Sequence, residues 1–192
     1  MSARERILDA AAEVMQKSGV AATTTRQIAR AAGCSEALLY KHFAHKQELF
    51  VAVLNERLPR LSDPRELAGT RTVAENLATL VEQLLAFYLR SFPMAASVFS
   101  SPSLRDAHRN SLSTMGAGPD QPARLLQTYL EIESRRGRLA PDTDCHALAR
   151  VLTGAALFEA FQASYAGADE IDDAGTLAAR IVAVVGTDIG GR

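Results

Sequence analysis

A short segment near the N-terminus is rich in side chains that bind phosphate. Tyr40, Lys41, His42 and Lys46 bring a phenol, two ammonium groups and an imidazole close together in the chain. Such groups hydrogen-bond to phosphate oxygens, and a helix that begins at Lys46 would add backbone N–H groups with partial positive charge. This spacing favours a grip on a nucleic-acid backbone, although a solvated charged face would have the same composition.

The residues before this segment predict two short helices that would position it. Thr24 can cap one helix with Gln27 at its third position, and Ser35 can cap another of similar length. Gly33 lies between the two helices and supplies the backbone freedom that a sharp turn requires. Two short helices joined at a glycine form a helix-turn-helix, whose second helix lies in the major groove of DNA.

The first turn of that second helix would meet the base edges. Leu38 could touch a thymine methyl group, while Glu36 could only accept a hydrogen bond from a cytosine amino group or repel phosphate. The first helix would clamp the backbone alongside. The predicted DNA contacts are Thr24, Thr25, Arg26, Ser35, Glu36, Ala37, Leu38, Tyr40, Lys41, His42 and Lys46.

This stretch resembles the DNA-binding segment of the tetracycline-repressor-like (TetR) family of bacterial one-component regulators. The resemblance covers residues 3 to about 55. The family pattern is met at Thr24, Thr25, Ile28, Ala29, Ala32, Gly33, Ser35, Leu39, Tyr40, His42, Phe43, Lys46 and Leu49. Cys34, Leu38 and His45 differ from the residues that are usual at those positions, which leaves the operator sequence open.

The resemblance implies an all-α homodimer with three N-terminal helices on DNA and a larger C-terminal domain that holds a ligand. It implies a transcriptional regulator rather than an enzyme, without a cofactor. The family default is a repressor that a small molecule releases from a palindromic operator. Half-sites would then lie about one helical turn, roughly 10 bp, or a multiple of it apart.

Apolar spacing along the rest of the chain is helical almost everywhere. We predict a DNA-binding domain over residues 1–50 and a ligand-binding and dimerisation domain over residues 51–192, linked by a helix at about 46–58. The proline- and glycine-containing stretch 59–70 would mark the boundary. Further helices are expected at about 71–92, where Pro93 ends or kinks the helix, and at about 94–100, 103–115, 121–136, 143–165 and 174–189.

The last two of these helices predict self-association. The helices at about 143–165 and 174–189 carry more apolar residues than one buried stripe can use. If a monomer exposed the second face, it would leave an unusually large apolar patch. Pairing with a second copy in a four-helix bundle would cover that face and would present two recognition helices to a palindrome.

Aromatic and other large side chains of the central helices could line an effector pocket. Such a pocket would be apolar with few polar anchors, and would suit a small hydrophobic or amphipathic molecule. Aromatic residues at helical spacing can equally be plain core. The candidate ligand-binding residues are Tyr88, Phe92, Met94, Phe99, His108, Met115, Tyr129, Phe158 and Phe161.

Composition fits a globular protein of the cytoplasm. The 192 residues carry a net charge of −1, of which residues 1–50 contribute seven basic minus five acidic side chains, or +2, and the remainder −3. No apolar run approaches the roughly 18 to 20 residues of a membrane helix, and the N-terminus is too charged for a signal peptide. The two cysteines are expected to stay reduced; Cys34 could be a packed turn residue or an oxidant-sensing thiol.

Two other classes of function remain open. Asp142, Asp144, Cys145 and His146 could bind a metal in an enzyme, although acidic residues there could simply favour a helix N-terminus. No nucleophile elbow, phosphate loop or zincin motif is present, so we expect neither catalysis nor a bound metal. A DNA-compacting protein is disfavoured because the charge is too balanced for sequence-blind binding.

Overall fold

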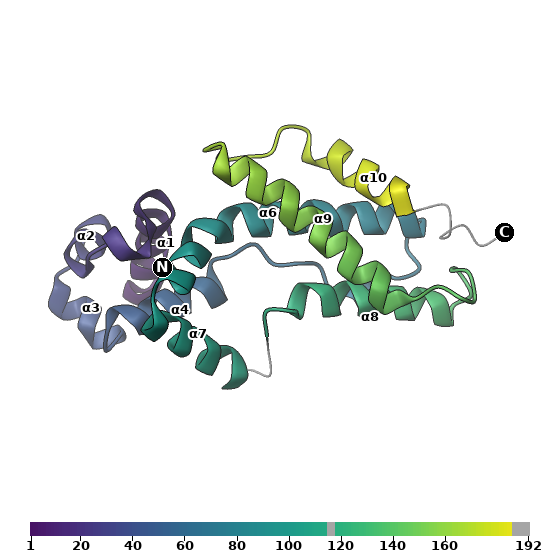
Figure 1. Ribbon diagram of the computed structural model, residues 1–192. Coiled ribbons are helices and arrows are strands. Elements are labelled where there is room, and N and C mark those ends of the chain that lie inside the picture. The colour runs from purple at the N-terminus through teal and green to yellow at the C-terminus, as the bar shows by residue number, and fades with distance from the viewer. Residues whose placement is uncertain (115–117, 186–192) are drawn as a thin grey trace. The chain divides into compact units, whose positions relative to one another are not determined.

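In the computed structural model, which describes residues 1–114 and 118–185, every regular element is a helix (Figure 1). The expected all-α class is therefore confirmed. The helices are α1 (Ala3–Ala22), α2 (Thr25–Ala31), α3 (Glu36–His42), α4 (Lys46–Glu56), α5 (Pro64–Leu67), α6 (Val73–Ser100), α7 (Pro102–Thr114), α8 (Gln121–Arg135), α9 (Cys145–Tyr165) and α10 (Ala174–Val185).

The described residues pack into two compact units. The first combines residues 1–58 with residues 90–114 and 118, and the second combines residues 59–89 with residues 119–185. Helix α6 therefore contributes its first part to the second unit and its last part to the first. These units are defined by packing, whereas the expected division near residue 50 separates a DNA-binding domain from a ligand-binding domain. That functional division stays a prediction.

The first unit is built on the amphipathic helix α1. Ile7, Leu8 and Met15 lie on one face of α1 and are buried against Leu39 of α3 and Phe50 of α4. Burial of large apolar side chains is the dominant favourable term in folding. Because α1 to α4 share this one core, α1 and α4 support the helix-turn-helix that α2 and α3 form.

A glycine interrupts α1 and is held from a distant part of the chain. Gly19 has φ +70°, a conformation that glycine adopts without strain, and it breaks the regular helix. The N–H of Val20 then donates to Ser97 Oγ of α6 at 3.1 Å. The irregular backbone is therefore not left unsatisfied inside the protein.

Pro93 lies inside α6, so of the two expected outcomes the helix does not end there, and the separate helix expected at 94–100 is wrong because these residues continue α6. Proline removes a hydrogen bond and disfavours a helix interior. Here Leu89, Met94 and Val98 are buried on either side of it, so tertiary packing offsets that cost. The stretch 59–70, which was expected as a boundary, contains the short helix α5.

The remaining helix bounds follow the expectation closely. Helix α9 begins two residues later than predicted, and α4 and α8 end slightly earlier. Residues 186–189 of the last expected helix, and Met115 at the end of another, lie outside the described residues. None of the described helices combines the length and the apolar character that a bilayer crossing needs.

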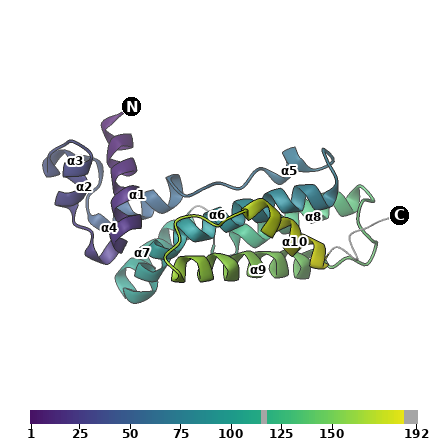
Figure 2. The ribbon, with the colours of Figure 1, turned by 90° about the horizontal axis from the view of Figure 1, so that it is seen from above.

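The second unit packs α6, α8, α9 and α10 around one core. Figures 1 and 2 show α9 lying against α8 and α10, which the contacts between these helices support. The buried face of α9 consists mainly of Ala149, Leu152, Ala156 and Ala160. Small residues allow helices to approach closely, so α9 fits tightly into the unit with little side-chain volume.

A fully buried carboxylate ties the loop before α6 to α8. Glu133 accepts a hydrogen bond from the N–H of Gly69 at 2.8 Å, and its other oxygen lies 3.2 Å from the Arg138 guanidinium. Arg138 in turn donates to the carbonyl of Arg71. Burial raises the pKa of the neighbouring Tyr129 phenol to about 12.

Replacement of Glu133 by alanine should destabilise the second unit. The Gly69 N–H would lose its acceptor and the Arg138 guanidinium its ion-pair partner, and we expect a loss of about 2 to 3 kcal/mol in the free energy of unfolding. Chemical denaturation of the purified chain measures it. The control is Glu82→Ala on the exposed face of α6, which makes the same charge change. Equal losses for the two variants would contradict the anchoring role.

Candidate nucleic-acid interface

The predicted caps of α2 and α3 are present and fix where both helices begin. Thr24 Oγ1 accepts from the N–H of Gln27 at 3.2 Å, and Gln27 Oε1 accepts from the N–H of Thr24 at 2.8 Å. Ser35 Oγ accepts from the N–H of Leu38 at 3.2 Å. These side chains satisfy backbone donors that a helix N-terminus leaves free.

The turn between the two helices brings them close together. Gly33 has φ +64°, and the N–H of Cys34 donates to the carbonyl of Ala29 at 2.9 Å. Ala29 is buried, so its small side chain lets α3 cross next to α2. Cys34 is partly buried and packs against the core of the unit.

The predicted DNA contacts form the solvent side of this helix-turn-helix. Tyr40, Lys41 and Ala37 are exposed on α3, while Leu38 and His42 are partly buried. On α2 and its cap, Thr24 and Arg26 are exposed and Thr25 is partly buried; Ser35 is exposed and Glu36 partly buried. The predicted DNA contacts of α2 and α3 therefore lie on two neighbouring helices of the first unit.

Side chains of α2 and α3 also contact each other directly. Arg26 Nε donates to Glu36 Oε1 at 3.2 Å, and Thr25 Oγ1 donates to Glu36 Oε2 at 3.3 Å. Thr25 Oγ1 lies 3.2 Å from the Tyr40 hydroxyl as well. Sequence reasoning named these four residues as separate DNA contacts and missed that they form one network, because the spacing of two helices is not visible in a sequence.

The start of α4 is capped by a histidine. His45 Nδ1 accepts from the N–H of Glu48 at 3.1 Å, and Glu48 Oε2 accepts from the N–H of Ala44 at 2.7 Å. Histidine therefore takes the place of the serine, threonine or aspartate that is usual at this position in the TetR pattern. The cap fixes the first turn of α4 and with it Lys46.

Lys46 lies where a lysine does not favour folding. Partial burial lowers the pKa of its ammonium group, and the N-terminus of a helix repels positive charge. Within the described residues, no carboxylate lies at ion-pair distance from it. A phosphate group at this place would provide the missing negative charge.

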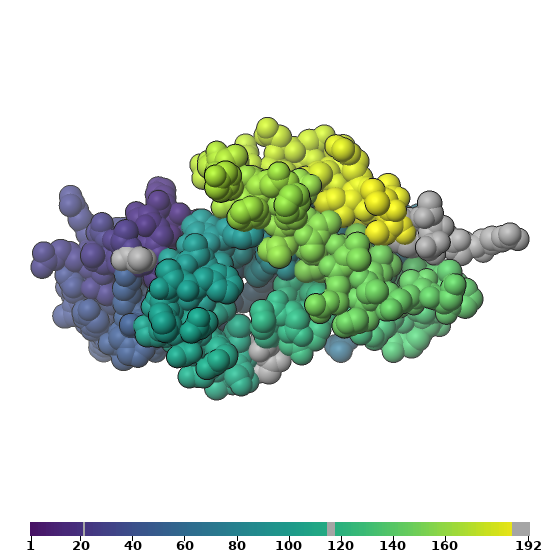
Figure 3. Space-filling view, in the orientation of Figure 1, coloured from purple at the N-terminus to yellow at the C-terminus, as the bar shows by residue number. Residues whose placement is uncertain are grey.

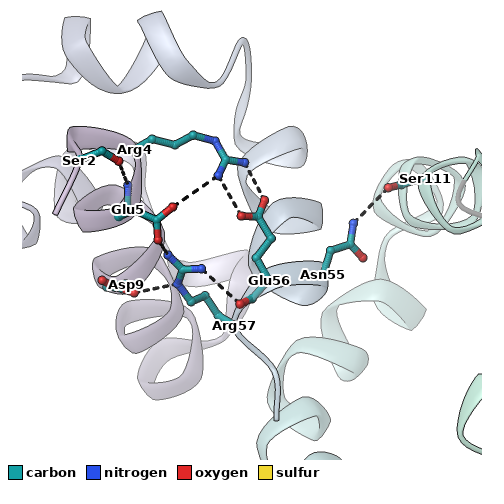
Figure 4. A network of polar contacts seen from close by, with 8 residues as sticks. All are labelled: Ser2, Arg4, Glu5, Asp9, Asn55, Glu56, Arg57 and Ser111. Atoms are coloured by element: carbon teal, nitrogen blue, oxygen red, sulfur yellow. Dashed lines mark hydrogen bonds and ion pairs between the residues drawn. The ribbon is translucent and has the colours of Figure 1, made fainter. Parts of the chain in front are cut away.

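Ion pairs join the two ends of the unit's helical frame. Arg4 of α1 forms two hydrogen bonds to Glu56 at the end of α4, at 2.6 and 2.8 Å (Figure 4). Arg57 donates to Asp9 at 2.7 Å and also pairs with Glu5. The two arginines thereby connect the N-terminal half of α1 to the C-terminus of α4.

Two further contacts extend this frame. The Arg4 guanidinium lies 5.4 Å from the centroid of the Phe43 ring, which follows α3, and Asn55 Nδ2 donates to Ser111 Oγ of α7 at 3.3 Å (Figure 4). Helix α4 is thus tied to both α1 and α7. These pairings could not be predicted from the sequence, since the partners lie far apart in the chain.

The candidate ligand residues do not share one core. Met94 is buried in the first unit and Tyr129 in the second, whereas Phe99, Phe158 and Phe161 are exposed. Tyr88, Phe92 and His108 are partly buried, and burial raises the pKa of Tyr88 to about 12 and lowers the pKa of His108. Met115 lies outside the described residues. The assignment of these residues to an effector stays a prediction.

The residues considered for a metal site have structural partners. Asp144 Oδ1 accepts from the N–H of Ala147 at 2.9 Å and caps α9, and His146 Nδ1 lies 3.0 Å from Gln127 Oε1. Burial raises the pKa of the Cys145 thiol. Among the residues that the structure describes, no group of three or more His, Cys, Asp or Glu side chains is placed to hold a metal ion.

The sequence profile of the bacterial regulatory proteins of the tetR family matches residues 7–53. The chain carries a tetR-family domain. This match spans α1 to α3 and most of α4, the part of the chain whose caps, turn and core are described above.

Individual relatives agree with this assignment. The transcriptional repressor KstR2 of Mycobacterium tuberculosis is 34% identical over 91 residues, which is 47% of this chain and 43% of the relative. The chain spans less than half the length of the first curated relatives that it matches.

Solved structures show that the tetR-family fold extends over the whole chain. A TetR-family regulator from Mesorhizobium loti superposes with a TM-score of 0.73 over 96% of this chain and 95% of its own, at 20% identity. The regulator FadR of Bacillus subtilis, solved with stearoyl-CoA, has a TM-score of 0.69 at 17% identity, over 94% and 96% of the two chains. At these identities the likeness concerns the fold alone.

Replacement of His45 by alanine should loosen the start of α4. We expect a loss of about 1 kcal/mol in the free energy of unfolding, the usual effect of removing a helix cap. Asparagine retains an acceptor at this position, so His45→Asn should keep most of the stability. Urea denaturation compares the two variants, and equal losses would show that the Nδ1 hydrogen bond does not stabilise the helix.

Proposed function

We propose that the chain is a sequence-specific, DNA-binding transcriptional regulator that binds a palindromic operator as a homodimer. The observation that carries this proposal is the helix-turn-helix surface: Arg26, Tyr40 and Lys41 are exposed above a fully packed core. Lys46, partly buried and without a carboxylate partner among the described residues, points to the same kind of ligand. Arginine, lysine and tyrosine are the side chains that bind base edges and phosphates.

We infer repression rather than activation, in line with relatives such as KstR2, which is named a repressor, although FasR of Mycolicibacterium smegmatis is named an activator. A repressor acts by occupying its operator. We infer that this chain represses transcription in the bacterial cytoplasm, where its DNA target lies, and that a small molecule releases it. A ligand that shifts operator affinity needs only about 1 to 3 kcal/mol of coupling between the two sites.

The effector is proposed to be hydrophobic or amphipathic. The similar fold of FadR holds stearoyl-CoA, a molecule with a long apolar chain. The packed core of the second unit consists largely of leucine, valine and tyrosine side chains of α6 and α8, so a ligand that entered it would have to be apolar.

The surface of α9 and α10 supports the proposed homodimer. The side of α9 that faces away from its own core carries large apolar residues at helical spacing, and α9 and α10 together cover part of the face seen in Figure 3. A groove between these helices is lined by Glu159, Leu177, Arg180, Ile181, Ala183 and Val184. The exposed apolar residues of the two helices are Val151, Leu157, Phe158, Phe161, Tyr165 and Val184.

Selection of duplexes from a random DNA pool tests the proposed function. The purified full chain at near-physiological salt should enrich a palindrome whose half-site centres lie about one helical turn, or a multiple of it, apart. Lys46→Ala should weaken binding to all sequences and flatten the dependence of affinity on salt, because one phosphate contact is lost. A pool without any enriched sequence would contradict the proposal.

Replacement of Phe158 by glutamate should break the homodimer. The side chain is 58% exposed in the single chain, so the substitution should leave the monomer folded while placing a charge in the proposed interface. Light scattering should show a shift from dimer to monomer, with an unchanged helical circular dichroism spectrum. Phe99→Glu is the matched control, since Phe99 is 77% exposed on α6 and should leave the dimer intact.

A further inference from the structure

Glu36 occupies an unusual place for an acidic side chain. It is the first residue of α3, the helix proposed to enter the major groove, where a carboxylate would be repelled by phosphates. Both of its oxygens are engaged from α2, one by Arg26 Nε at 3.2 Å and the other by Thr25 Oγ1 at 3.3 Å. The carboxylate is therefore held sideways against α2.

This pairing contributes little to the stability of the free protein. The side chain of Arg26 is 89% exposed and that of Glu36 is 37% exposed, and exposed ion pairs are weak in water. The two helices are already joined by the buried residues Ile28 and Leu39 and by the backbone hydrogen bond between Cys34 and Ala29. The contact between Arg26 and Glu36 therefore adds little to folding. It lies on the surface that we propose binds DNA, so its role is sought in DNA binding.

The geometry leaves the terminal nitrogens of Arg26 available. Only Nε donates to Glu36, so the two NH₂ groups of the guanidinium can still form a pair of hydrogen bonds to a base edge such as guanine O6 and N7. A flexible arginine must lose its rotational freedom to make such a contact. A carboxylate that holds Nε restricts that freedom before DNA arrives.

We propose that Glu36 is a positioning residue that orients Arg26 for base reading, and that the two residues set operator discrimination as one unit. Glu36 also offsets the charge of Arg26, so that the pair gains little from phosphates of any sequence. Arg26 in turn shields the carboxylate from the DNA. This inference rests on the proposed DNA-binding function and adds to it the source of selectivity at one base position.

A double-mutant cycle tests the proposal. Affinities of the full chain for the selected operator and for duplexes with single base-pair changes give a discrimination ratio at each half-site position. Arg26→Ala should lower the ratio at one position by roughly tenfold to a hundredfold, because the base contact is lost. Glu36→Ala should lower the ratio at the same position by up to about fivefold, because an exposed ion pair can restrict Arg26 only weakly. The double variant should lose no more than Arg26→Ala alone, within about twofold.

Glu36→Gln separates position from charge. Glutamine keeps an acceptor for Arg26 Nε, so most of the discrimination should remain, while binding to every duplex becomes tighter because a negative charge is gone. A loss of discrimination as large as that of Glu36→Ala would overturn the positioning role. Unchanged thermal unfolding of each variant shows that the fold is not the cause.

Arg30 supplies the matched control. It is an exposed arginine on the same helix, with no carboxylate at ion-pair distance within the described residues. The losses of Arg30→Ala and Glu36→Ala should add, because the two residues do not act together. If the losses of Arg26→Ala and Glu36→Ala also add, the coupling is absent and this inference falls while the operator stands. If the wild-type chain selects no operator, both proposals fall.

Discussion

The short distance between α2 and α3 depends on the buried side chains Ile28 and Leu39 and on the backbone hydrogen bond in the turn, from the N–H of Cys34 to the carbonyl of Ala29. That bond requires the positive φ of Gly33, and a larger side chain at position 29 would push the helices apart. The distances from Arg26 and Thr25 to Glu36 depend on this crossing, as does the contact between Thr25 and Tyr40. The candidate interface is thus determined by backbone geometry first and by its polar side chains second.

Local features of this unit could be read from the sequence, whereas its long-range pairings could not. The caps at Thr24 and Ser35 depend on neighbouring residues only, and both were predicted correctly. Pro93 misled because its effect depends on tertiary packing, which buries Met94 and Val98 and keeps α6 continuous. The TetR sequence pattern at the N-terminus also predicted the all-α class of the remaining chain, because proteins with this pattern share a fold that extends beyond the residues of the pattern.

Helix α4 is held at both ends by different means. Its start depends on the His45 cap, and its C-terminus depends on Arg4 and on Arg57, whose guanidinium pairs with two carboxylates of α1. Several partly buried charges in one network constrain geometry more than isolated surface pairs do. A displacement of α4 would therefore move α1 with it, and α1 carries the core on which α2 and α3 rest. The ion-pair network therefore couples α4 to α1, so that α1 to α4 would move together.

Helix α9 has its small side chains on the inner face and large apolar side chains on the outer face, which is the reverse of what a helix in a monomeric protein would favour. Its inner face is mostly alanine, while Phe158, Phe161 and Tyr165 are exposed. Burial of a phenylalanine gains far more free energy than burial of an alanine, so a monomer would favour the opposite arrangement. The small inner residues let α9 lie close to α8 and α10, while the large outer residues remain exposed, although the rings of Phe161 and Tyr165 lie 6.1 Å apart and contact each other. A second copy, related by a twofold axis, would bring the same aromatic residues against each other and would account for both faces of the helix.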